Sequence, residues 1–153
     1  QMAETDKKLK ALGIQVGGID ENQGHHAEQY FQNAFEENPV FGGVKYDEMI
    51  LNLAHKSRAA EIEFDIALLN GNSIALIEAK NRIHPKFVKK FAEERVQKFK
   101  QYFLEFKGYK VYLGIAGFSF SKAVLEEAEK YGIGVVRQVG NSIEMSKKKL
   151  KVY

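Results

Sequence analysis

The spacing of apolar residues changes along the chain between a period near 3.6, typical of helices, and a period of two, typical of strands. The helical spacing predicts helices over residues 24–37, 85–107 and 121–131. Alternating or continuous apolar runs predict strands over residues 44–54, 60–69, 73–80, 109–116, 133–139 and 142–152. Consecutive strands followed by helical crossovers imply an α/β domain with a mixed central sheet and helices on both faces.

The most regular alternation lies in residues 60–69 and predicts a two-faced strand. Its apolar face is expected to hold Ile62, Phe64, Ile66 and Leu68, and its polar face Glu61, Glu63 and Asp65. The dipeptide Asn70-Gly71 that follows is a strong hairpin signal. Residues 73–80 are therefore expected to return as the partner strand.

The length of the hairpin loop decides which residues of the two strands face each other. A two-residue turn at Asn70-Gly71 puts Asp65 opposite Leu76, with Glu78 one pleat further along the same face. A four-residue loop puts Asp65 directly opposite Glu78, whereas a three-residue loop moves Asp65 to the other face. In the first two registers Asp65, Glu78 and Lys80 share one face.

Asp65, Glu78 and Lys80 supply the groups needed for metal-assisted phosphodiester hydrolysis. Two carboxylates at one end of a hairpin repel each other unless a cation neutralises them, and Mg²⁺ favours oxygen ligands. A lysine beside them can orient the attacking water and offset phosphate charge. The alternative is an exposed strand face with an incidental ion pair between Glu78 and Lys80. Ile74 and Leu76 on the same face indicate a partly covered site, where unpaired charge is unfavourable.

Composition narrows the class of protein further. The chain has 153 residues, of which 44% are hydrophobic and 28% charged, as in a single globular domain. The absence of cysteine excludes disulfides, thiol nucleophiles and cysteine zinc sites. No run approaches the roughly 18 apolar residues of a membrane span, and the first residues lack the apolar core of a signal peptide. We therefore expect a cytoplasmic protein with no membrane partner.

Charge is distributed unevenly along the chain. Residues 1–81 carry 7 Lys and Arg against 13 Asp and Glu, whereas residues 82–110 carry 9 against 3. An acidic segment followed by a basic one is typical of a carboxylate site beside a polyanion-binding surface. Solvated helix faces are the alternative explanation.

Asp65, twelve intervening residues and then Glu78-x-Lys80 on a predicted hairpin resemble the motif of the PD-(D/E)xK nuclease superfamily. The order of helix, hairpin, helix, strand, helix and strand is similar to the core of that superfamily. The resemblance therefore implies a restriction-endonuclease-like α/β fold and hydrolysis of DNA. Phe64 stands where many members have proline, a difference that is common within the superfamily.

The N-terminal stretch carries a narrower resemblance. Residues 4–10, Gly17-Gly18 and residues 22–24 look like those of small, largely uncharacterised bacterial proteins, many from cyanobacteria, in which a heptad-repeat helix precedes a nuclease-like domain. This resemblance implies that residues 1–20 are the end of an N-terminal helix and a linker, and that residues 21–153 are the nuclease-like domain. The N-terminal helix would then promote a homo-oligomer.

The superfamily resemblance implies a role for each residue of the site. Asp65 and Glu78 would ligate Mg²⁺ or Mn²⁺, with the carbonyl of Ala79 as a further ligand. Lys80 would position the water, and Glu28 in the first helix would complete the acidic cluster. Without a cation the three carboxylates should repel one another, so we expect a raised pKa on at least one of them.

The helix after the motif is expected to contact the nucleic acid. In related resolvases and restriction enzymes a polar residue of this helix faces the site, and Gln97 is the candidate here, with Arg95 and Lys98 as near competitors. The basic residues expected to hold the DNA backbone are Lys86, Lys89, Lys90, Arg95 and Lys98. The sequence thus predicts a Mg²⁺- or Mn²⁺-dependent deoxyribonuclease. The alternative is a non-catalytic nucleic-acid-binding or oligomerisation module that retains the fold.

Overall fold

A computed structural model describes residues 19–146 and 149–153 of the chain. The predicted N-terminal helix, and with it the proposed route to a homo-oligomer, lies outside the described residues. Within the described ranges no helix is both long enough and apolar enough to cross a lipid bilayer.

The centre of the fold is a six-stranded mixed sheet with the strand order β3-β4-β5-β6-β7-β8. Its strands are β3 (Glu48–Lys56), β4 (Glu61–Leu69), β5 (Ser73–Ala79), β6 (Lys110–Gly117), β7 (Gly134–Val139) and β8 (Ser142–Met145). β5, β6 and β7 run parallel because helices cross over between them, whereas the remaining neighbours pair antiparallel. The predicted α/β fold with a mixed sheet flanked by helices is confirmed.

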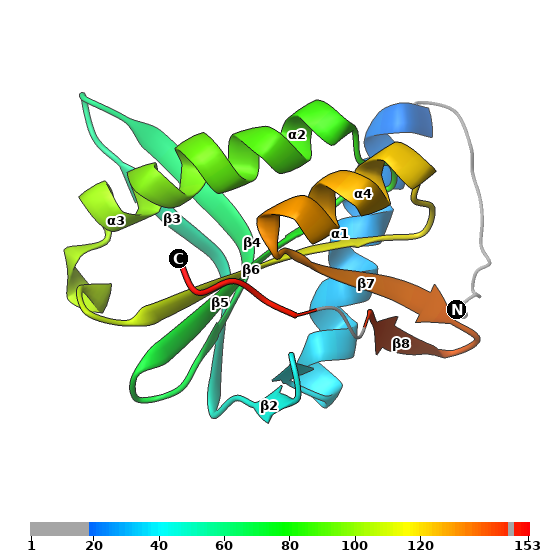
Figure 1. The fold of residues 1–153 in the computed structure, drawn as a ribbon, viewed down its shortest axis with the longest axis horizontal. Coiled ribbons are helices and arrows are strands. Elements are labelled where there is room, and N and C mark those ends of the chain that lie inside the picture. Colours follow the sequence, from blue (N-terminus) through cyan, green and yellow to red (C-terminus); the bar gives the residue numbers. More distant parts are fainter. Residues whose placement is uncertain (1–18, 147–148) are drawn as a thin grey trace.

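Helices cover both faces of this sheet (Figure 1). One face is covered by α1 (Ile19–Glu37), whose Phe31 and Phe35 are fully buried against the sheet. The other face is covered by α2 (Pro85–Lys90), the π-helix η2 (Phe91–Arg95), α3 (Val96–Tyr102), the 3₁₀-helix η3 (Leu104–Phe106) and α4 (Lys122–Tyr131). Two hydrophobic clusters result, one on each side of the sheet, as expected when amphipathic helices bury both sheet faces.

Two predicted strands are shorter in the structure. The strand predicted over 44–54 begins at Glu48, because the positive φ angles of Gly42 and Gly43 turn the chain back and form a separate two-stranded sheet. That sheet consists of β1 (Val40–Phe41) and β2 (Val44–Lys45). The strand predicted over 142–152 ends at Met145. Within residues 149–153, the amide of Lys151 donates to the carbonyl of Gly132 before β7, and the amide of Tyr153 donates to the carbonyl of Val111 in the first half of β6.

The predicted alternation of β4 is wrong in its second half. Phe64 packs on the face covered by α2 and α3, but Ile66 and Leu68 pack on the face covered by α1. The change of face occurs at Asp65, opposite Asn52 of β3, which has a positive φ of 54° and leaves the ladder. Asn tolerates this left-handed conformation better than most residues. A regular period of two could not predict this local reversal.

Gly114 in the middle of β6 is required by close packing. A Cβ atom at this position would lie 2.7 Å from two ring atoms of the buried Phe41. We therefore expect Gly114→Ala to lower the free energy of unfolding by about 1–3 kcal/mol through overpacking. Gly71→Ala is the matched control, because no atom lies within 4 Å of a Cβ there. Urea denaturation of both variants checks this, and equal stabilities would contradict the packing described here.

Candidate active site

The hairpin between β4 and β5 has the four-residue loop that the sequence left open. Leu69 pairs with Ile74, and the Asn70 amide donates to the carbonyl of Ser73 at 3.0 Å. Gly71 lacks the positive φ of a type I′ turn. The Asn70 side chain instead accepts the Asp47 amide at 3.2 Å, which ties the loop to the start of β3. This register places Asp65 directly opposite Glu78.

Asp65 and Glu78 lie where the β4–β5 ladder ends, since its last backbone pair is Ile66 with Ile77. Each carboxylate accepts the backbone amide that the ladder no longer satisfies. The Asp65 amide donates to Glu78 Oε2 at 2.8 Å, and the Ala79 amide donates to Asp65 Oδ2 at 2.8 Å. Each side chain thus hydrogen-bonds to the backbone of the opposite strand, and these two bonds fix the positions of both carboxylates.

Gln32 of α1 satisfies the backbone at the same point. Its amide nitrogen donates to the carbonyl of Asp65 at 3.1 Å and lies 3.4 Å from the side-chain oxygen of Asn52. The sequence analysis did not identify Gln32. Its position one helical turn after Glu28 was the available signal, because residues four apart share a helix face.

Glu28 joins the pair from α1, as the resemblance implied. Its half-buried side chain is hydrogen-bonded to the carboxyl group of Asp65. Glu28 and Gln32 therefore contact the side chain and the main chain of one residue. The structure brings Glu28, Asp65 and Glu78 together as a row in which Asp65 is central.

Arg95, rather than Gln97, reaches the carboxylates. Its Nη2 lies 3.2 Å from Glu78 Oε1 and donates to the carbonyl of Glu63 at 2.6 Å. Gln97 and Lys98 are exposed, and the expectation that Gln97 faces the site stays a prediction. Arg95 reaches Glu78 because it lies at the end of the π-helix η2, beside the buried residues of the helix.

The signal for Arg95 was present in the sequence. It lies four residues from both Phe91 and Phe99, so a charged side chain interrupts an apolar helical stripe. Its guanidinium carbon lies 4.8 Å from the ring centroid of Phe64, and its Nε is buried without a hydrogen-bond partner. The charge of the guanidinium offsets part of the charge of Glu78.

Lys80 lies beside the carboxylates at the end of β5. Its half-buried side chain places the ammonium group 4.8 Å from the ring centroid of Phe87, and its charge acts on both Asp65 and Glu78. The backbone here is closely packed, since a Cβ atom on Gly117 would lie 2.8 Å from the carbonyl oxygen of Lys80. The absence of a side chain at Gly117 therefore lets the end of β6 pack directly against the backbone of Lys80, the lysine of the motif.

Burial and mutual repulsion perturb both carboxyl groups. Burial raises the pKa of Asp65 to about 7, and the hydrogen bond and charge of Glu28 add to this increase. The hydrogen bond from the Ala79 amide and the charge of Lys80 act in the opposite direction. Burial, followed by the charge of Asp65, raises the pKa of Glu78 to about 7, whereas the charge of Arg95 lowers it. The expected raised pKa is confirmed for these two residues. The pair titrates as one coupled unit, so the protons belong to the site and not to either residue alone.

The donor set suits a hard divalent cation, although the side chains are not yet arranged around one. Carboxylate oxygens are the ligands that Mg²⁺ and Mn²⁺ take in proteins. Among the described residues, no three His, Asp or Glu side chains form a group that could already hold an ion. Both oxygens of Glu78 accept hydrogen bonds, one of them from Arg95. Each of these oxygens keeps a further lone pair, so a cation can either bind beside the Arg95 contact or displace it.

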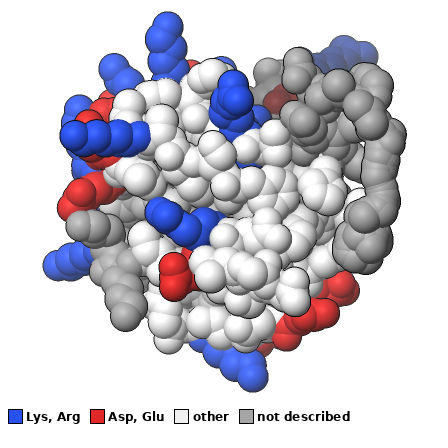
Figure 2. All heavy atoms as spheres, turned by 90° about the vertical axis from the view of Figure 1, so that its right-hand side faces the viewer, with Lys and Arg blue, Asp and Glu red and all other residues white. Residues whose placement is uncertain are grey.

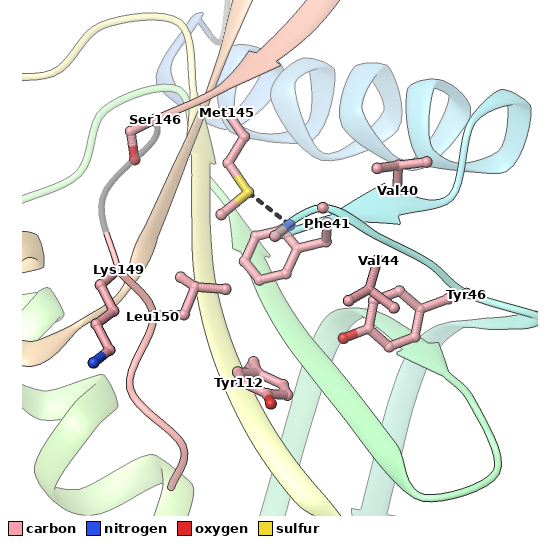
Figure 3. Close-up of a pocket in the computed structure, with 11 residues that line it drawn as sticks. Val40, Phe41, Val44, Tyr46, Tyr112, Met145, Ser146, Lys149 and Leu150 are labelled. Atoms are coloured by element: carbon pink, nitrogen blue, oxygen red, sulfur yellow. Dashed lines mark hydrogen bonds between the residues drawn. The ribbon is translucent and has the colours of Figure 1, made fainter.

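A separate cavity of about 430 Å³ contains none of these residues (Figure 3). It lies between the β1–β2 turn, the first half of β6 and the segment after β8. Its walls include the aromatic side chains of Phe41, Tyr46 and Tyr112. With mainly apolar walls and no acidic side chain, this cavity does not supply the chemistry found at the carboxylates.

No protein-family model and no curated protein matches the sequence. Among solved structures, the chain is similar to that of Can2 from Sulfobacillus thermosulfidooxidans in complex with cyclic tetra-adenylate (cA4), at 15% sequence identity and a TM-score of 0.45. The match covers 72% of this chain and 30% of Can2, so the chain spans less than a third of that protein. A likeness this distant transfers neither a site nor an activity.

Asp65→Asn should stabilise the protein in the absence of metal. The asparagine oxygen can still accept the Ala79 amide, and its nitrogen can donate to Glu28 in place of the present repulsion. Because the folded-state pKa values lie above ordinary carboxyl values near 4, the folded protein binds more protons than the unfolded chain between pH about 4 and about 7. The free energy of unfolding should therefore fall as pH rises through this window and stay low above it.

Urea denaturation between pH 4 and pH 9 measures this effect. We expect Asp65→Asn to gain about 1–2 kcal/mol over the wild type near pH 8 and to lose the gain near pH 4. Glu63→Gln is the matched control, because Glu63 is an exposed carboxylate on the same strand. A difference in the free energy of unfolding between Asp65→Asn and the wild type that stays constant across the whole pH range would show that Asp65 does not have the raised pKa.

Proposed function

We propose that this chain is a metal-dependent nuclease that hydrolyses phosphodiester bonds in DNA. The observation that carries the proposal is the register that sets two desolvated carboxyl groups opposite each other, with a lysine two residues further along. Two carboxyl groups with raised pKa values at one point of a sheet are unfavourable for stability and are typical of functional sites. The motif that resembles PD-(D/E)xK nucleases consists of the same three residues.

The proposed ligands of Mg²⁺ or Mn²⁺ are Asp65 and Glu78, with Glu28 and the carbonyl of Ala79 as further ligands. A bound divalent cation supplies Lewis acidity at a phosphoryl oxygen. Lys80, held near the Phe87 ring, would orient the attacking water and offset the charge that develops on the phosphate. Arg95 would release Glu78 when the cation binds.

The proposed contact surface for the DNA backbone is the exposed side of the helix that follows the motif. Lys86, Lys89 and Lys90 are exposed on α2, which begins five residues after Lys80. Lys98 and Gln97 are exposed on α3 and extend this surface. Exposed lysines position a nucleic-acid backbone without reading its sequence.

A second candidate function is a nucleic-acid-binding module without catalysis. The contact between Arg95 and Glu78 favours it, because the guanidinium already neutralises part of the charge that a metal would neutralise. The lack of a ready group of three ligands among the described residues favours it as well. The two functions differ in one measurable property, cleavage in the presence of divalent metal.

Cleavage of supercoiled, linear, single-stranded and branched DNA with Mn²⁺ tests the first proposal. We expect Asp65→Ala and Lys80→Ala each to lower the cleavage rate by at least about a hundredfold, and the double variant to be no slower than the worse single variant. Glu63→Gln should cut at the wild-type rate. A wild-type rate in either site variant would remove that residue from the site. Metal-independent DNA binding without cleavage of any substrate would support the non-catalytic module.

The salt dependence of DNA binding in EDTA tests the contact surface. Replacing Lys86, Lys89 and Lys90 together by Gln should make the slope of log affinity against log salt shallower by about 2, because each lost phosphate contact removes about 0.7–0.9. The matched control is Lys107→Gln combined with Lys110→Gln, at the far end of the same crossover. If both variants change the slope by the same amount per lysine replaced, α2 has no special role in binding.

A further inference from the structure

Three aromatic side chains form a partly exposed cluster where β6 ends, here termed the aromatic platform and consisting of His26, Tyr30 and Phe118. The ring of Phe118 lies 5.6 Å from that of His26 and 5.5 Å from that of Tyr30, measured between centroids. Beneath them the fully buried ring of Phe31 lies 5.4 Å from Phe118. Tyr30 and Phe118 are half-buried and His26 is exposed, so the platform keeps an open outer side on a fixed base.

The platform and the carboxylates are positioned by the same helix. Ala27 and Phe31 form the buried stripe of α1, and Tyr30 lies on the flank of that stripe nearer to the end of β6. Glu28 and Gln32 lie on the opposite flank, where they contact Asp65 of β4. The register places Glu78, opposite Asp65, beside Ile115 of β6, so Phe118 lies two strands across from Asp65 and three residues further along. Strand spacings of about 4.8 Å and a rise of about 3.3 Å per residue give a separation of roughly 14 Å. This equals about four steps of a stacked nucleic-acid strand at roughly 3.4 Å each.

The surroundings of the platform suit a base and its backbone. The loop after β6 lies on the side of the molecule that is turned to the viewer in Figure 2. The described centre of that side is mainly uncharged, with basic side chains and an adjoining acidic one in its middle and both kinds along its borders (Figure 2). The exposed Arg137 is one basic group close by, with its guanidinium carbon 6.0 Å from the ring centroid of Phe120, two residues after Phe118. Aromatic faces bind bases and cations bind phosphates.

We propose that the aromatic platform stacks an unpaired nucleobase a few nucleotides from the phosphate at the carboxylates. The position of that phosphate rests on the proposed function. A base inside a duplex is stacked between its neighbours and has no free face, so the platform selects DNA with a single-stranded segment beside the scissile bond. Stacking on aromatic rings tolerates any base, so the preference is for structure and not for sequence.

Fluorescence anisotropy in EDTA tests the platform without cleavage. The probes are a labelled oligothymidylate and a blunt duplex of the same length. We expect Tyr30→Leu and Phe118→Leu each to weaken binding of the single strand by roughly tenfold, and to leave duplex binding and the salt slope unchanged. His26→Ala, at the exposed edge, should have a smaller effect in the same direction. Tyr109→Leu is the matched control, a half-buried aromatic at the other end of β6.

Melting temperatures show which variants are folded. If Phe118→Leu fails to fold, Tyr30→Leu and His26→Ala decide the question, since His26 is exposed and Tyr30 is only half-buried. Unchanged single-strand affinity in a folded variant would overturn the proposal, and so would an equal loss for the duplex. Loss of single-strand binding in a protein that never cleaves would uphold the platform and refute the nuclease. Cleavage at equal rates with and without single-stranded segments, together with unchanged single-strand binding in the variants, would refute the platform and uphold the nuclease.

Discussion

Asp65 and Glu78 face each other where the β4–β5 ladder stops, and each accepts the backbone amide that the ladder leaves unsatisfied. Two carboxyl groups out of water cannot both ionise without a large electrostatic penalty, which is why their pKa values rise. The neighbouring contacts offset this penalty. Arg95 and Lys80 supply positive charge, and Gln32 satisfies the carbonyl that the change of face in β4 leaves exposed.

The helices contribute to the site through an irregular π-helical turn as well as through their packing on the sheet. The π-helix at the end of which Arg95 lies sets a cation within an otherwise apolar stripe, and π turns are frequent at functional sites. On the other face of the sheet, one flank of α1 places Glu28 near β4, and the opposite flank places Tyr30 of the aromatic platform near the end of β6. One rigid helix therefore fixes the distance between the proposed chemistry and the proposed base-stacking surface.

Most elements of the fold could be predicted from apolar periodicity, because long helices and buried strands carry strong patterns. The pairing of Asp65 with Glu78 was one of three open registers, and the loop interactions of Asn70 decided it. The face of Ile66 and Leu68 could not be predicted, since the reversal depends on a left-handed residue in the neighbouring strand. Gln97 was the candidate because the resemblance implied a polar residue of this helix at the site, whereas the side chain that contacts Glu78 in the structure is the half-buried Arg95, one of its two near competitors.

Isothermal titration calorimetry with Mn²⁺ measures the central claim most directly, when it is repeated near pH 7 in buffers of different ionisation enthalpy. A cation that binds a protonated pair of carboxyl groups must displace a proton. The account predicts one site that releases about one proton near pH 7 and fewer at pH 9, and loss of this binding in Asp65→Asn. Binding without proton release, or undiminished binding in Asp65→Asn, would contradict it.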